Sequence, residues 1–107
     1  QGTGTSAIPT ATVRLRVKDE VIAGAAVGDG PVDAACRAIS QVTKSSAKLV
    51  RYEIRAVTSG TEAIGEVTVQ LEEGGRKVMG RGASTDVIEA SAKAYIDGLN
   101  KLTSLGG

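Results

Sequence analysis

The sequence predicts an α+β fold in which two strand-strand-strand-helix units, related by a pseudo-twofold axis, form antiparallel sheets with two packed helices. Three observations predict it: the two halves of the chain match each other, apolar and polar residues alternate along several segments, and helical spacing follows each alternating region. We expect the 107 residues to form a single domain, 1–107, with an internal repeat at about 1–45 and 47–104. The two helices are expected to pack together over a common sheet.

The two halves superpose without gaps when the sequence is shifted by 56 residues. Identical residues then fall together along a strand region, at one glycine and at two alanines. The pairs are Thr12 and Thr68, Val13 and Val69, Leu15 and Leu71, Gly24 and Gly80, Ala34 and Ala90, and Ala38 and Ala94. Two copies of one supersecondary unit are the simplest explanation of this match.

The first copy opens with a predicted hairpin. Apolar and polar residues alternate over 12–18, which is typical of a half-buried strand. The polar pair Asp19-Glu20 predicts a turn, and 21–27 predicts the returning strand.

The second copy repeats this pattern over 67–71 and 77–81, joined by a turn at 73–75 whose glycines can adopt positive φ. A further strand is predicted over 48–58, followed by a flexible polar connection at 58–61. Shifted back by 56 residues, that strand falls almost entirely before Gln1. We therefore expect the first strand of the first repeat to be truncated, and the chain to be part of a longer protein.

Helices are predicted over Pro31–Val42 and Thr85–Leu102, because apolar residues recur there at three- and four-residue steps. Pro31 suits a first helical turn, where its missing N–H costs nothing. Ser84 or Thr85 can cap the second helix, and Asp86 in the first turn favours the helix dipole.

The composition argues against several functions. A net charge of +1 is far from the basic excess of nucleic-acid-binding proteins, and no apolar run approaches a membrane span or a signal peptide. We expect a cytoplasmic protein without nucleic-acid or membrane partners. The lone Cys36 lies among alanines, which favours a buried hydrophobe, and the absence of histidine excludes Ser-His and Cys-His catalysis. No catalytic residue, metal site or cofactor is predicted for this chain.

The segment Gly28–Asp33 is the first candidate site. Its glycines allow a ligand to approach the backbone, and the helix that follows offers free N–H groups to a carboxylate or phosphate. Asp29 or Asp33 could face an ammonium group. The alternative, a plain strand-to-helix turn with a capping aspartate, explains the same residues equally well.

Other candidates are subordinate. The equivalent junction Ala83–Asp86 could meet the first across the pseudo-twofold axis, although an ordinary capped helix accounts for it. A phosphate site at Gly74–Lys77 is less favoured than a hairpin turn. Tyr52 is expected in the core with its hydroxyl at a pocket rim, and Tyr95 in the core or a dimer interface.

Several motifs in the same order resemble the C-terminal regulatory domain of 2-isopropylmalate synthase. They are Gly28–Ala34, Tyr52–Val67, Gly80–Asp86 and Ala90–Tyr95, with the opening Gly2–Thr5 and Ile8–Thr12. The resemblance implies an allosteric domain of two strand-strand-strand-helix units that dimerises, binds leucine and inhibits an upstream catalytic barrel. In that family the barrel condenses acetyl-CoA with 2-oxoisovalerate and uses a divalent metal, whose ligands are absent from this chain.

The resemblance also implies an effector pocket. Carried over by motif, its residues are Gly28, Asp29, Gly30, Val32, Asp33, Leu49, Tyr52, Ala56, Ala63, Ser84 and Thr85. Loop and helix-end groups would hold the charges of the zwitterion, while Leu49, Tyr52 and Ala56 would enclose a branched aliphatic tail. Three alternatives remain: the isoleucine-binding regulatory domain of citramalate synthase, a homocitrate-type relative, and a dimerisation module with a vestigial pocket.

Overall fold

The computed structural model describes residues 10–17, 20–28 and 30–106. Along the chain its elements are β1 (Thr10–Val17), β2 (Glu20–Val27), α1 (Pro31–Thr43), β3 (Lys48–Ser59), β4 (Glu62–Glu73), β5 (Arg76–Ser84) and α2 (Val87–Gly106). Every predicted strand and helix is present, so the α+β class is confirmed. The second helix begins two residues later than predicted and runs on to Gly106.

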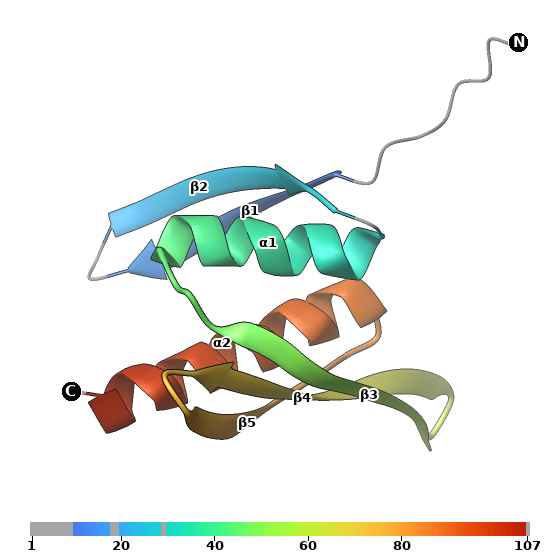
Figure 1. The fold of residues 1–107 in the computed structure, drawn as a ribbon. Helices are drawn as coiled ribbons and strands as arrows, with labels where there is room; N and C mark the ends of the chain where they lie inside the picture. The colour runs from blue at the N-terminus through green and yellow to red at the C-terminus, as the bar shows by residue number, and fades with distance from the viewer. Residues whose placement is uncertain (1–9, 18–19, 29, 107) are drawn as a thin grey trace, which may run out of the picture.

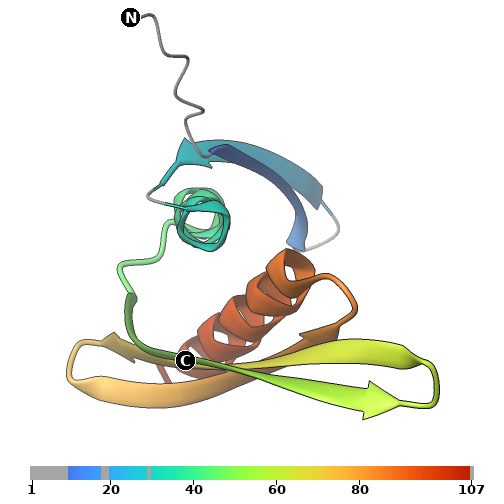
Figure 2. The ribbon, with the colours of Figure 1, turned by 90° about the vertical axis from the view of Figure 1, so that its right-hand side faces the viewer.

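The strands form two separate antiparallel sheets, one of β1 and β2 and the other in the order β3-β4-β5. The predicted common sheet is therefore wrong. The helix α1 packs on β1 and β2, α2 packs on β4 and β5, and the helices contact each other. Figures 1 and 2 show both helices lying between the two sheets. Because each helix covers its own hairpin, strands of different sheets are kept apart.

A shift of 56 residues relates the elements as well as the residues. It places β1 on the second part of β4, β2 on β5, and α1 on the first part of α2. Glu73 pairs with Arg76 across a turn in which Gly74 and Gly75 have φ of 60° and 83°. Positive φ at both central residues is the requirement of a tight hairpin turn, so the turn prediction is confirmed.

The predicted polar connection at 58–61 is instead the end of a longer hairpin. Ser59 pairs with Glu62, and Gly60 has a φ of 65° in the turn between them. The strands β3 and β4 continue past the region that α2 covers, so Ala56 and Ala63 near the hairpin end are exposed. Both alanines have polar neighbours in the sequence, which interrupt the alternation of apolar and polar residues that predicts a strand.

Small residues allow each helix to lie close to its hairpin. A Cβ added to Gly80 would overlap the Ala94 carbonyl oxygen, and one added to Gly98 would lie 2.7 Å from Leu71 Cδ1. At the matched position of the first copy, a Cβ on Gly24 would overlap Val42 and approach the Ala38 carbonyl oxygen at 3.6 Å. The same contact between a strand glycine and a helix alanine thus occurs in both halves.

One apolar core joins the two halves. Among the side chains that the structure describes, its members come from α1 and from the second copy: Cys36, Ile39, Val67, Val69, Leu71, Val78, Ala90, Ala94, Tyr95, Leu99 and Leu102. The hydroxyls of Ser40 on α1 and Tyr95 on α2 lie 2.6 Å apart, which links the helices directly. Burial raises the pKa of Tyr95, which lies in the core, one of the two positions predicted for it. No helix in the described part of the chain is long and apolar enough to cross a membrane.

Candidate functional site

The junction between β2 and α1 has two glycines with different environments. A Cβ on Gly28 would overlap the Ala34 backbone, so this glycine is explained by the packing of the strand end against the helix start. Gly30 is the N-cap residue of α1, with extended backbone (φ −161°) that any residue can adopt. Apart from its chain neighbours, no described residue has an atom within 4 Å of a Cβ built on it, so this side of the helix start is open among those residues.

The first turn of α1 has no side-chain cap among the described residues. Its backbone ladder begins with the Ala34 N–H, which donates to the Gly30 carbonyl at 2.8 Å. Pro31 at the helix start contributes no N–H of its own. The amides of the following residues therefore keep the capacity to bind an anion. Asp29, the other residue predicted here, lies outside the described part of the chain.

Asp33 lies in this first turn and pairs with Arg37, whose Nε donates to Asp33 Oδ2 at 2.8 Å. Both side chains are partly exposed. The carboxylate and the guanidinium thus present opposite charges side by side on α1. A carboxylate and a guanidinium of this kind can bind the ammonium and carboxylate groups of a small zwitterion.

The start of α2 is capped by its own residues. Asp86 Oδ1 accepts hydrogen bonds from the Ile88 N–H at 2.8 Å and the Glu89 N–H at 3.4 Å. The Ser84 hydroxyl accepts from the Asp86 N–H at 3.1 Å and donates to Glu89 Oε1 at 2.9 Å. That bond, followed by the interaction with Lys93, lowers the pKa of Glu89.

The prediction that Ser84 or Thr85 caps this helix is wrong. The helix begins at Val87, which makes Asp86 the N-cap, and Ser84 supports the cap from the preceding strand. The two helix starts therefore differ: α2 is closed by side chains of its own junction, and α1 has no such cap in the part of its junction that the structure describes.

A hollow of about 380 Å³ lies between α1 and the beginning of β3. It brings together Asp33 and Leu49 of the predicted site, and its lining is Asp33, Cys36, Arg37, Ser40, Gln41, Ala47, Leu49 and Tyr95. Leu49 is 40% exposed and offers an apolar surface opposite the charges on α1. The hollow combines an ion pair, hydroxyl groups and apolar walls, which are the elements of a site for a small amphipathic molecule.

Sequence reasoning missed Arg37, Ser40 and Gln41 as lining residues. The signal was present, because Asp33, Arg37 and Gln41 follow one another at four-residue steps and therefore share one face of α1.

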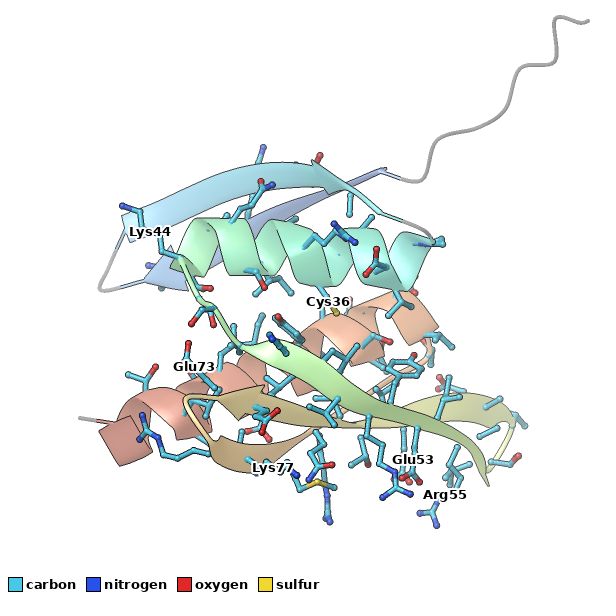
Figure 3. The ribbon with its side chains drawn as sticks, in the orientation of Figure 1. Cys36, Lys44, Glu53, Arg55, Glu73 and Lys77 are labelled. Atoms are coloured by element: carbon cyan, nitrogen blue, oxygen red, sulfur yellow. The ribbon has the colours of Figure 1, made fainter. Side chains whose placement is uncertain are left out.

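Cys36 in the wall of the hollow is an inert thiol. It is 6% exposed, and burial, followed by the nearby Asp33 carboxylate, raises its pKa to about 11. Figure 3 shows the side chain directed from α1 toward α2. A thiol so strongly held in the neutral form is a poor nucleophile, so the prediction of a small buried hydrophobe is confirmed.

The remaining predicted residues come from the first turn of α1, from β3 and β4, and from the junction before α2. Val32 and Tyr52 both pack against the core, and the hydroxyls of Tyr52 and Ser91 are 2.7 Å apart. Ser91 donates its proton to the Val87 carbonyl, so the tyrosine is the donor in this pair.

Figure 1 shows the starts of α1 and α2 and the end of the β3–β4 hairpin at one end of the fold. Among the described residues, no single hollow contains all of the predicted site.

Two other depressions lie elsewhere. One, on the outer face of the three-stranded sheet, is lined largely by charged side chains such as the pair Arg55 and Glu66, 2.7 Å apart. The other lies where α1 ends, near Lys44 and Glu73.

The described part of the chain contains no group of three or more His, Cys, Asp or Glu side chains that could hold a metal ion.

Comparison with known proteins connects this geometry to a family. Residues 2–103 match the family described as the LeuA allosteric (dimerisation) domain. The chain is 55% identical over 101 residues to a 2-isopropylmalate synthase of Carboxydothermus hydrogenoformans, covering 94% of the chain and 20% of that relative. It is 52% identical to the enzyme of the same name from Heliobacterium modesticaldum, over 92% of the chain and 19% of the relative.

An archaeal relative is similar over the same region. The 2-isopropylmalate synthase of Methanocaldococcus jannaschii is 46% identical, over 94% of the chain and 19% of the relative. The chain thus spans about a fifth of the length of the curated relatives it matches.

Proposed function

Because the chain belongs to the LeuA allosteric (dimerisation) domain family, we propose that it is the regulatory domain of a 2-isopropylmalate synthase. In this proposal the domain binds leucine as a feedback inhibitor and forms a homodimer. The condensation of acetyl-CoA with 2-oxoisovalerate belongs to a metal-dependent catalytic barrel elsewhere in the longer protein. The relatives of this name, all covered over a fifth of their length, support this division of labour.

The observation that carries the effector site is the difference between the two helix starts. The first turn of α1 has no side-chain cap among the described residues and has open space beside Gly30, whereas Asp86 caps α2. Free amides at the start of a helix favour a carboxylate, so the α1 junction is the better binding end for the carboxylate of leucine.

The apolar part of leucine needs a wall close to that junction. Val32 and Tyr52 pack on one core, and Leu49 lies opposite α1 across the hollow of about 380 Å³. On the helix-facing side of the sheet, Ala56 pairs with Gly65 and Ala63 with Thr58, and both alanines are exposed. Ser84 and Thr85 stay in the proposed site as its outer margin, with Ser84 already engaged in the α2 cap.

Isothermal titration calorimetry of the chain with leucine, isoleucine and valine tests the proposal. Leucine is expected to bind most tightly, with isoleucine weaker by a factor of about 10 to 200, because a misplaced methyl group costs about 1–3 kcal/mol in an apolar pocket. Preferential binding of isoleucine would instead assign the chain to a citramalate-synthase type of regulation. If none of the three amino acids gave heat, the chain would be a dimerisation module with a vestigial pocket.

A matched pair of variants localises the site. Ala56→Leu places a bulky side chain on the helix-facing side of the sheet, where Ala56 is exposed, and should weaken leucine binding by about tenfold or more without unfolding the chain. Ala83→Leu makes the same change at an exposed alanine on the outer face and should leave the affinity unchanged. Equal affinities for the two variants would contradict the proposed position of the pocket.

A further inference from the structure

The strand β3 is an uncovered edge of the three-stranded sheet. Among the described strands it pairs only with β4, and it reaches α2 through the Tyr52 side chain, whose hydroxyl lies 2.7 Å from that of Ser91, whereas α2 packs directly on β4 and β5. It spans 12 residues, contains no proline and has one bulge, at Val50, where the pairing register shifts between Leu49 and Arg51. A long edge strand of this kind offers a row of backbone donors and acceptors to another strand.

The opposite edge of the same sheet is closed by side chains of α2. Asp97 Oδ2 accepts a hydrogen bond from the Arg81 N–H at 3.0 Å, and Lys101 Nζ donates to the Met79 carbonyl at 2.7 Å. The two side chains also pair with each other at 3.3 Å. The bond from the Arg81 backbone, aided by Lys101, lowers the pKa of Asp97. A further strand cannot pair with β5 at these positions.

The open edge carries exposed apolar side chains as well. Val50 is 50% exposed and Ile54 is 49% exposed, and Ile54 pairs with Val67 on the face of the sheet that packs on α2. Edge strands of monomeric proteins are usually protected by charges, proline or short length. After the bulge, β3 lacks such protection on this face.

The charges on the other face of β3 form a self-complementary series. Arg51, Glu53 and Arg55 alternate along the strand, and Figure 3 shows Glu53 and Arg55 directed away from the helices. When the strand pairs antiparallel with a copy of itself about Ile54, each Glu53 lies opposite Arg55 of the second copy. A register centred on Glu53 would place Arg51 opposite Arg55. One centred on Tyr52 would place the bulged Val50 opposite Ile54 near the middle of the ladder, whereas pairing about Ile54 places Val50 opposite Thr58 near its end.

We propose that β3 is the homodimer interface, pairing antiparallel with β3 of a second copy about a twofold axis at Ile54. The three-stranded sheets of the two copies then join into one continuous sheet, and the two Ile54 side chains cover each other. This inference rests on the proposed dimerisation and specifies the surface that performs it. It requires the same patch on both copies, as a twofold interface must.

Disulfide trapping tests the register. Residues directly opposite in an antiparallel pair have Cα atoms about 4.5–5.5 Å apart, within the span of a disulfide. In a Cys36→Ala background, Ile54→Cys should form a covalent dimer under mild oxidation. Met79→Cys, a similarly exposed residue (39%) on the closed edge, should not. Trapping at position 79 but not at 54 would overturn the proposal.

Analytical ultracentrifugation of the 107-residue chain tests the interface without cross-linking. Ile54→Lys places two ammonium groups opposite each other and should weaken dimerisation by about tenfold or more, whereas Met79→Lys should not. Circular dichroism checks that both variants fold. A dimer that survives Ile54→Lys would refute this interface while leaving dimerisation intact. A wild-type chain that stays monomeric at all concentrations would refute both, and leucine binding would still be decided by calorimetry.

Discussion

At the scale of single residues, small side chains make up much of the core. The core contains Cys36, Ala90 and Ala94 beside Val, Leu and Ile, and tyrosine is the only aromatic residue type in the chain. The sequence correctly predicted that Cys36 is buried and offered the core as one of two positions for Tyr95, because each recurs with apolar neighbours at helical spacing. It could not predict the hydroxyl pairs of Tyr95 with Ser40 and of Tyr52 with Ser91, since those partners are 55 and 39 residues apart.

The buried thiol of Cys36 makes stability depend on alkaline pH. Its pKa is raised from 9.0 to about 11 in the folded chain, so the unfolded chain ionises first as the pH increases. The stabilisation that the neutral thiol adds to the free energy of unfolding is therefore fully present below pH 9 and is lost between pH 9 and 11. A shift of this size corresponds to about 2–3 kcal/mol of unfolding free energy.

Urea unfolding followed by circular dichroism between pH 8 and 11 measures this loss. Cys36→Ala should be less stable at neutral pH but should lose less stability in the alkaline range. A remaining decrease above about pH 10 is expected in the variant, because burial also raises the pKa of Tyr95. Parallel pH profiles for wild type and variant would contradict the assignment to Cys36.

At the scale of elements, α2 protects the sheet edge on which it lies. Asp97→Ala removes the acceptor of the Arg81 N–H, so hydrogen exchange at that amide should accelerate, with a loss of global stability of no more than about 1 kcal/mol for an exposed side chain. Exchange at Thr68, in the central strand opposite Arg81, serves as the internal control and should not change. Unchanged exchange at Arg81 would mean that the side chain does not close the edge.

The elements themselves were largely predictable from the sequence. Local patterns are sufficient for the hairpin turn at Gly74-Gly75 and for the two helices, because these depend on neighbours in the chain. Long-range features were not predictable. The separation of the strands into two sheets and the hollow beside Leu49 depend on how the helices pack, and the cap at Asp86 depends on where α2 begins. For the candidate site, motifs predicted Asp33 and Leu49 of the hollow but not the lining contributed by Arg37 and Gln41.

At the scale of the whole molecule, the two halves are stabilised by one core. Ile39 on α1 is fully buried among residues of the second copy, and Ser40 beside it pairs with Tyr95 on α2. Described residues of each helix are therefore buried against the other half. We expect the chain to unfold as one cooperative unit rather than as two independent repeats.

Ile39→Ala tests this coupling because it removes apolar volume at the contact between the halves. The loss in unfolding free energy should be about 2–5 kcal/mol, as for other large-to-small changes in well-packed cores. Amide exchange should then accelerate to a similar extent in α1 and in α2, since both helices lose protection through the same global opening. Exposed Val21 on β2 provides the control, and Val21→Ala should change stability by no more than about 0.5 kcal/mol. If Ile39→Ala released α1 and the β1–β2 hairpin while α2 kept its protection, the second copy would be an autonomous folding unit, and the shared core would be a contact between two domains rather than the basis of one.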